Sequence, residues 1–419
     1  MREKYSNSTW FPLFCFLSIC WGNPAWGQEA LWSHPGLGEN PNLSVLLEDS
    51  KVTLILVGSP FRGGVLALDP KDGSQRWVTE LTERINRPGR MLTDVALFST
   101  HMGTLVAIDP EDGDEMWRQA SDNPGDFAAV SPMVVEGSIY TLTVRGVLNR
   151  YAANGERMNS KTIPTEWEGR RAEFVPMWRD ATGLSFLDQA GRLRSFDLAS
   201  LEPIDEKKIV TAVGPGMDQL GSEVIGGVYS AAQGRIWSTE LSGLLRSSQV
   251  ETGRTRWTAY IARPEELYGS DGRILAVPIL SLPPDQRCLV LTRTRANMLS
   301  AETGAVLRVH DLPSPAVAPP LFDIDRRTWW ILTEDYLVAL GWDGELRSTR
   351  LPLVEKPYAA ALAGSNLIVG TASGRVYSMT LPLPVAPAPT APPTSSSEEV
   401  DSKVTEEIQA LFNPFQGGP

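Results

Sequence analysis

The chain has 419 residues, 42% of them hydrophobic, and a formal net charge of −12. This size and apolar content are enough for a large core, and closed all-β folds reach this length as one domain. The acidic balance excludes a typical nucleic-acid-binding protein, which needs a basic face. An acidic surface is the usual solution for solubility, although a cationic partner would also fit it.

The N-terminus has the pattern of a secretory signal peptide. Arg2 and Lys4 form a basic start, and residues 10–21 form an apolar stretch too short to span a bilayer. Small residues stand one and three places before Gln28, which predicts cleavage there. Residues 1–27 are therefore predicted to be a signal peptide. We expect export to the periplasm or the outer-membrane periphery, with no transmembrane segment in the mature chain.

The cysteines agree with export but add little to it. Cys15 and Cys20 lie in the predicted signal peptide, which leaves Cys288 alone in the mature chain. A single thiol forms no internal disulfide, so the fold has to rest on its core. Ile19 stands where a lipoprotein signal has a small residue, so lipidation at Cys20 is less favoured than simple cleavage. An uncleaved anchor is the third alternative.

One unit returns along most of the chain. Its clearest copies are residues 64–77 and 103–117, each an apolar run, a turn rich in Asp, Pro and Gly, and a second run that carries a tryptophan. Weaker copies begin near Gly146, Gly191, Gly243, Arg295, Asp335 and Gly374. A period of roughly 40–50 residues with several short strands per repeat indicates a propeller or a solenoid.

The region around the third copy shows the whole repeat. Four strand-like runs, Val130–Val135, Ser138–Thr143, Val147–Tyr151 and Glu156–Ile163, are separated by short turns. Four antiparallel strands joined by tight hairpins make one propeller blade.

The two ends of the repeat region predict how the fold closes. The last copy has three runs between Tyr358 and Thr380 and stops at Pro382, so its fourth strand is missing. The mature N-terminus supplies an unassigned strand, Glu29–Ser33. Pairing the two would remove both sheet edges. We therefore predict an all-β, eight-bladed β-propeller of four-stranded antiparallel blades, with seven blades as the alternative if one weak copy is an insertion.

The motif Gly-x-Leu-x-Ala-Leu-Asp-x-x-x-Gly, followed by Trp, resembles the quinoprotein-type (PQQ-like) propeller repeat over residues 28–381. In that family the tryptophan docks between neighbouring blades. The tryptophans to which the resemblance assigns this role are Trp32, Trp77, Trp117 and Trp257. Met158 or Asn159 stands at this place in the third copy, and Ser348 in the seventh, so the ring of tryptophans is expected to be irregular.

The resemblance implies one of two functional classes. The first is the PQQ-dependent dehydrogenases, which carry adjacent cysteines, a calcium site and often a haem segment. The second is the non-catalytic propellers, notably those of the BamB type in the outer-membrane barrel-assembly machine. The chain has neither a Cys-Cys pair nor a Cys-x-x-Cys-His motif. The resemblance therefore favours the non-catalytic class, with neither PQQ nor calcium expected.

No other pattern predicts catalysis. His34, His101 and His310 are isolated, so a metal site is not expected. The Asp-Pro-x-Asp-Gly turns lack the alternating oxygen ligands of a calcium loop. Neither Gly-x-Ser-x-Gly nor a phosphate-binding loop occurs. We accordingly assign no catalytic, cofactor-binding or metal residues.

Partner-binding residues are predicted on long connections and in the tail. The connections between blades carry apolar or aromatic tips at Trp167, Met217 and Tyr268, and long loops on a rigid scaffold are the usual place for recognition. The alternative is that each tip packs onto its own blade.

The C-terminal region changes composition abruptly. Residues 382–401 are rich in Pro, Ala and Ser and predict a disordered linker. Residues 402–419 form a short acidic segment whose apolar side chains fall on one helical face. These apolar residues are Val404, Ile408, Leu411 and Phe412. The segment is either a docking peptide for a partner or a tail that packs nowhere.

The sequence thus predicts an exported, non-catalytic propeller scaffold, a monomeric ring within a larger complex. It would mediate protein–protein interactions in the bacterial envelope, with outer-membrane protein assembly as the nearest analogy. The missing lipoprotein signal and the Pro-rich extension depart from that analogy. A PQQ- or sugar-binding enzyme and a secreted or cell-surface adhesive module are the alternatives.

Overall fold

The computed structural model describes residues 30–48, 51–59, 63–85, 89–92, 94–163, 177–180, 183–209, 223–270, 274–281 and 286–381. These residues form eight four-stranded sheets, and every pair of neighbouring strands is antiparallel. The predicted signal peptide, linker and C-terminal segment lie outside the described residues. Among those described, no helix has both the length and the apolar character needed to cross a membrane.

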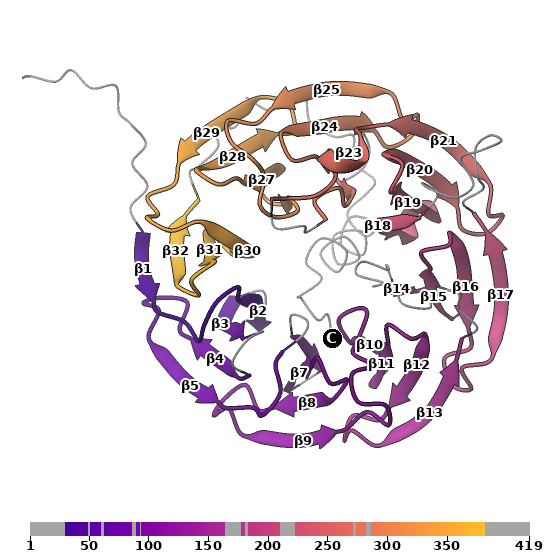
Figure 1. Cartoon of the computed structure of the whole chain (residues 1–419), viewed down its shortest axis with the longest axis vertical. Coiled ribbons are helices and arrows are strands. Elements are labelled where there is room, and N and C mark those ends of the chain that lie inside the picture. Colours follow the sequence, from indigo (N-terminus) through magenta and orange to yellow (C-terminus); the bar gives the residue numbers. More distant parts are fainter. Residues whose placement is uncertain are drawn as a thin grey trace, which may run out of the picture.

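Each sheet is one blade, and the blades stand side by side around a common centre (Figure 1). In blades 1 to 7 the strands follow chain order, and the fourth strand lies on the circumference. Blades 1 to 4 comprise β2 (Asn42–Glu48), β3 (Lys51–Gly58), β4 (Val65–Leu68) and β5 (Gln75–Thr79); β6 (Arg90–Leu92), β7 (Val95–Ser99), β8 (Leu105–Ile108) and β9 (Glu115–Gln119); β10 (Met133–Val135), β11 (Ser138–Leu142), β12 (Val147–Tyr151) and β13 (Arg157–Thr162); and β14 (Met177–Arg179), β15 (Leu184–Leu187), β16 (Arg192–Phe196) and β17 (Pro203–Lys208).

The second half of the ring repeats this order. Blades 5 to 8 comprise β18 (Val224–Ser230), β19 (Arg235–Glu240), β20 (Leu244–Gln249) and β21 (Thr255–Tyr260); β22 (Ile279–Leu280), β23 (Arg287–Leu291), β24 (Arg295–Ser300) and β25 (Val306–Asp311); β26 (Leu321–Asp323), β27 (Thr328–Leu332), β28 (Tyr336–Gly341) and β29 (Leu346–Arg350); and β30 (Pro357–Ala363), β31 (Asn366–Thr371), β32 (Val376–Thr380) and β1 (Ala30–His34). Two short 3-10 helices, Ala231–Gln233 and Pro264–Glu266, lie in connections.

The predicted closure of the ring is confirmed. β1 pairs antiparallel with β32, so the N-terminal strand completes blade 8. A bulge in β1 precedes Trp32, which lies opposite Ser378. The same bulge precedes Trp77 in β5 and Trp117 in β9. Eight blades are present, and the seven-bladed alternative is wrong.

The core lies between the blades. Strands such as β4 and β8 are buried along their whole length, because the second and third strands of each blade have neighbouring blades on both faces. One cluster joins Leu56 and Val65 of blade 1 to Ala96 and Phe98 of blade 2. Burial of this apolar surface stabilises the ring at about 25 cal/mol per Å², so each blade depends on its neighbours.

The four predicted tryptophans dock onto the next blade. The indole N–H groups of Trp32, Trp77 and Trp257 donate to the carbonyl oxygens of Pro70, Pro110 and Ala301 at 3.1, 2.9 and 3.1 Å. The rings lie over glycines in the turns of the following blade, Gly73, Gly113, Gly155 and Gly304. A Cβ atom at any of these glycines would stand 2.3 to 2.6 Å from the indole.

Two blades without this tryptophan keep the hydrogen bond. Asn159 occupies the position after the bulge in β13, and its Nδ2 atom donates to the carbonyl oxygen of Ser200 at 2.6 Å. Arg308 occupies it in β25 and donates to the carbonyl oxygen of Gly344 at 2.8 Å. A side-chain donor to the next blade therefore persists where the motif is diluted.

Candidate functional site

One face of the ring gathers the connections between blades. Strand direction alternates within a blade, so the chain leaves the fourth strand at the end where the hairpin between the second and third strands lies. We call this face, made of the inter-blade connections and these hairpins, the loop rim. Isolated bridges join Ile85 to Thr100, Ala128 to Thr143 and Ala316 to Thr333, which ties each connection to the hairpin of the following blade.

Carboxylates reinforce these ties at three inter-blade connections. Asp126 accepts hydrogen bonds from the hydroxyl of Thr143 at 2.9 Å and from the backbone N–H of Arg145 at 3.0 Å. Glu83 accepts hydrogen bonds from two threonine hydroxyls of the blade 2 hairpin. Glu355 accepts hydrogen bonds from the hydroxyls of Thr371 and Ser373 in the hairpin of blade 8. The described parts of the loop rim are thus held in fixed positions.

Electrostatics of the rim follow from these bonds. Hydrogen bonds from the hydroxyls of Ser373 and Thr371 hold the pKa of Glu355 below its ordinary value, because they stabilise the carboxylate. The ionised form is therefore the one that fastens the hairpin of blade 8.

Blades 4 and 5 use buried ion pairs in their hairpins. The carboxylate of Glu240 lies 2.7 Å from Arg246 Nε, and both side chains are 3% exposed. Asp188 and Arg194 repeat the arrangement at 3.1 Å. Burial raises the pKa of Glu240 and of Asp188, because it disfavours the charged forms. These carboxylates are engaged by arginine and are not free for proton transfer.

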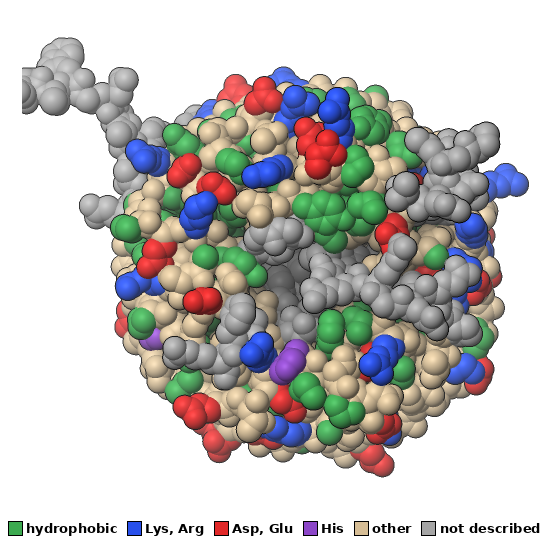
Figure 2. All heavy atoms as spheres, in the orientation of Figure 1, with side chains coloured by type: hydrophobic (Ala, Val, Ile, Leu, Met, Phe, Trp, Pro, Cys, Tyr) green, Lys and Arg blue, Asp and Glu red, His purple; other side chains and the backbone are tan. Residues whose placement is uncertain are grey.

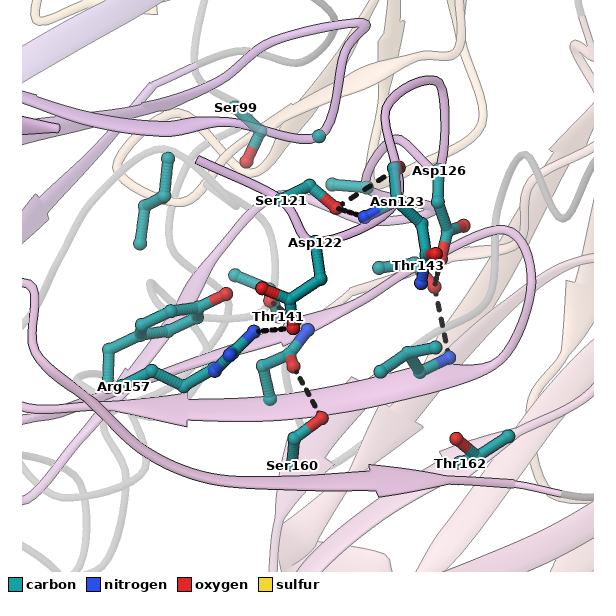
Figure 3. A pocket seen from close by; sticks show the side chains of 16 residues that line it. Ser99, Ser121, Asp122, Asn123, Asp126, Thr141, Thr143, Arg157, Ser160 and Thr162 are labelled. Carbon is teal, nitrogen blue, oxygen red and sulfur yellow. Dashed lines mark hydrogen bonds and ion pairs between the residues drawn. The ribbon is translucent and has the colours of Figure 1, made fainter. Parts of the chain in front are cut away.

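A polar cavity of about 190 Å³ opens between blades 2 and 3, beside the connection from β9 to β10 (Figure 3). Its lining side chains come from that connection and from strands of both blades. The polar ones labelled in Figure 3 are Ser99, Ser121, Asp122, Asn123, Asp126, Thr141, Thr143, Arg157, Ser160 and Thr162. No sequence pattern predicts this cavity, because its lining is scattered over about sixty residues of chain.

Of the predicted partner-binding residues, Tyr268 is the one that lies among the described residues. Tyr268 is half-buried, forms an isolated β-bridge with Ile274 and packs against the core of blades 5 and 6. This packing corresponds to the alternative in which a loop tip folds onto its own blade. Trp167, Met217 and the segment Val404–Phe412 lie outside the described residues, and their roles stay predictions.

An exposed apolar strand in blade 6 was also not predicted from the sequence. Val306, Leu307 and Val309 of β25 are 53%, 47% and 50% exposed. β25 is the outermost strand of blade 6, so its outer backbone edge has no neighbour in the sheet. Exposed apolar edges of this kind favour contact with other chains.

The rest of the described surface is mixed. Acidic and basic side chains are interspersed over the face in Figure 2, with a hollow at the centre. Within the described ranges, no group of three or more His, Cys, Asp or Glu side chains is placed to hold a metal ion. Cys288 is fully buried, and burial raises the pKa of its thiol far above the usual range.

Part of the chain matches a known protein family with the same kind of repeat. Residues 62–212 match the family described as outer membrane protein assembly factor BamB. No curated protein sequence matches the chain.

Solved structures extend the likeness to the whole ring. BamB from Moraxella catarrhalis matches with a TM-score of 0.63 and 16% identity, over 84% of this chain and 100% of that one. Sqt1 from Saccharomyces cerevisiae matches with a TM-score of 0.64 and 8% identity, over 84% and 99%. The C-terminal WD40 domain of Sif2 matches with a TM-score of 0.61 and 9% identity, over 85% and 98%.

Identities this low carry the fold alone, and the family match adds the type of repeat. The resemblance predicted from the tryptophan motif is thereby confirmed: the chain is an eight-bladed β-propeller, its residues 62–212 match the BamB family, and its fold is similar to that of BamB.

Proposed function

We propose that this chain is a non-catalytic, exported scaffold that presents its loop rim to a protein partner in the bacterial envelope, in the assembly of outer-membrane proteins. The observation that carries the proposal is the match of residues 62–212 to BamB. The match covers blades whose rim is fastened by Glu83 and Asp126. A rigid rim loses little conformational entropy on binding, which suits a protein-binding surface.

The state of the buried carboxylates supports a role without catalysis. Asp126 is satisfied by a hydroxyl and a backbone N–H, and Asp188 and Glu240 are paired with arginine. A general acid or base needs a group that exchanges a proton with a substrate. The described carboxylates at these positions instead hold hairpins in place.

The test is direct binding between the purified mature chain, residues 28–419, and the purified barrel-forming subunit of the assembly machine from the same cell. Charge reversals probe the rim at Arg145 and Asp335, both exposed on second-to-third-strand hairpins. Matched reversals at Lys71 and Glu251 probe exposed turns between third and fourth strands, on the opposite face.

We expect Arg145→Glu and Asp335→Arg to weaken binding by about tenfold each, or ~1.4 kcal/mol. Lys71→Glu and Glu251→Arg should leave binding unchanged. Equal losses on both faces would argue against recognition by the loop rim. Absence of binding by the unaltered chain would contradict the assembly role itself.

A further inference from the structure

The cavity between blades 2 and 3 is larger and more polar than the packing of two blades requires. Its volume of about 190 Å³ is large compared with the roughly 30 Å³ that one water molecule occupies in the liquid. The interface between blades 1 and 2, in contrast, is filled by apolar side chains in the cluster around Leu56 and Phe98. Here the lining is mostly polar (Figure 3).

Hydrogen-bonding groups in the wall remain available. Ser99 is 2% exposed, lines the cavity, and its hydroxyl has no hydrogen-bond partner. The Nδ2 atom of Asn149 is 3.5 Å from the hydroxyl of Thr141, at the limit of a hydrogen bond. The Oδ1 atom of Asn149 is held at 2.9 Å by the hydroxyl of Ser160, which fixes the amide in place. A buried polar group without a hydrogen-bond partner destabilises the folded protein, so a ligand or an ordered water is expected to bond to it.

The charged side chains in the lining all have partners. Arg157 of β13 forms an ion pair with Asp122 of the connection from blade 2 (Figure 3). Asp126 is satisfied by Thr143 and by the backbone of Arg145. An anion entering the cavity would therefore lose its hydration without gaining an unpaired cation, since Arg157 is already paired.

Apolar surface completes the lining. Leu105 and Tyr151 are 2% and 5% exposed and line the cavity beside the hydroxyl and amide groups. Hydroxyls that donate and accept, a fixed amide and an apolar wall together match a ring or chain that carries many hydroxyl groups on an apolar frame. We propose that this cavity binds a small, neutral, polyhydroxylated compound of monosaccharide size. The cavity lies among connections of the loop rim, but this proposal does not rest on the proposed role of the rim in protein assembly.

The experiment measures binding of two neutral probes, D-glucose and myo-inositol, to the mature chain by calorimetry and by saturation-transfer NMR. The charged analogues D-gluconate and D-glucosamine are titrated in parallel. A ligand of about a dozen non-hydrogen atoms in a preformed site is expected to bind with a Kd of roughly millimolar or below.

Two substitutions locate the site. Asn149→Ala removes the fixed amide from the interior, and Thr162→Val removes a hydroxyl from the exposed mouth while keeping its shape. Asn297→Ala is the matched control, because Asn297 is equally buried at 5% exposure, also lies in a third strand and does not line the cavity. Thermal unfolding of each variant checks that the ring is intact, and Thr162→Val tests the site even where Asn149→Ala unfolds the protein.

Saturable binding of a neutral probe is expected, weakened about tenfold or more in Asn149→Ala and in Thr162→Val and unchanged in Asn297→Ala. Failure of both neutral probes to bind at millimolar concentration would show that the cavity holds water alone and would overturn the proposal. Binding that survives the cavity substitutions, or that favours a charged analogue, would also overturn it.

Discussion

Replacement of Gly113 by alanine tests the docking of Trp77 between blades 1 and 2. Gly113 has a φ of +85°, and a Cβ atom there would stand 2.6 Å from Cδ2 of the indole. Gly125 is a matched control, because its φ is +84° and a Cβ atom there would meet nothing within 4 Å. The two substitutions share the backbone cost and differ in the clash.

The magnitudes follow from these two terms. A left-handed backbone costs a non-glycine residue about 1–2 kcal/mol, so Gly125→Ala should lower the free energy of unfolding by that amount. Forcing an extra methyl group into a packed contact adds about 1–3 kcal/mol. Gly113→Ala should therefore destabilise the ring by about 2–5 kcal/mol.

Urea denaturation followed by far-UV circular dichroism measures both variants. In a Trp77→Leu background the cost of Gly113→Ala should fall towards that of Gly125→Ala, because the ring that makes the closest contact is gone and only Thr79 Oγ1, at 2.9 Å, would still crowd the new methyl group. Equal destabilisation by Gly113→Ala and Gly125→Ala in the unaltered background would refute the inference that the indole and the glycine turn are in tight contact.

Three further outcomes follow from the structure. Trp32→Ala should destabilise the protein by about 3–5 kcal/mol, because it leaves a cavity in a buried contact where the ring closes. Leu31→Ala, at a position 54% exposed, should change stability by about 0.5 kcal/mol or less. Similar losses of stability in the two variants would argue against closure through β1. The pKa of Glu355 is lowered in the folded protein, so the stability that its carboxylate contributes is present above the ordinary glutamate pKa and is lost as pH falls through the folded-state pKa. In Glu355→Gln the urea midpoint should therefore fall less steeply with decreasing pH in the acid range. The same pH dependence of the midpoint in both proteins would contradict the capping role. The thiol of Cys288 is buried with a raised pKa, so a thiol reagent should label the mature protein only after unfolding, and rapid labelling of the native protein would contradict this burial.

The ring was predictable because its signals are local and repeated. Asp69, Pro70 and Gly73 specify a turn within five residues, and Trp77 follows at a fixed spacing. Closure was predictable because one strand was missing at one end and one was spare at the other. The innermost strands were harder to bound. The run Val130–Val135, predicted for the third copy, pairs as a strand only over Met133–Val135.

The features of the rim depend on contacts that no local pattern reveals. Glu83 caps Thr100 from a position 17 residues earlier in the chain, and nothing in the intervening sequence identifies the pair. Asn159 stands where the tryptophan motif predicts Trp, and Arg308 takes the same place in β25, yet each supplies the donor that an indole supplies elsewhere. The sequence shows that the tryptophan is replaced at these positions. Only the structure shows that the hydrogen bond to the carbonyl oxygen of the next blade remains.

Photo-crosslinking in the living cell tests the central claim most directly. A photoreactive amino acid is placed at Arg145 or Asp335 on the loop rim and, as controls, at Glu111 or Glu251 in turns on the opposite face. Crosslinks to the barrel-forming assembly subunit are expected from the rim positions in the envelope fraction, and none are expected from the control positions. Crosslinks from the control positions alone, or no crosslink to any assembly subunit, would contradict the claim that the loop rim is a scaffold for outer-membrane protein assembly.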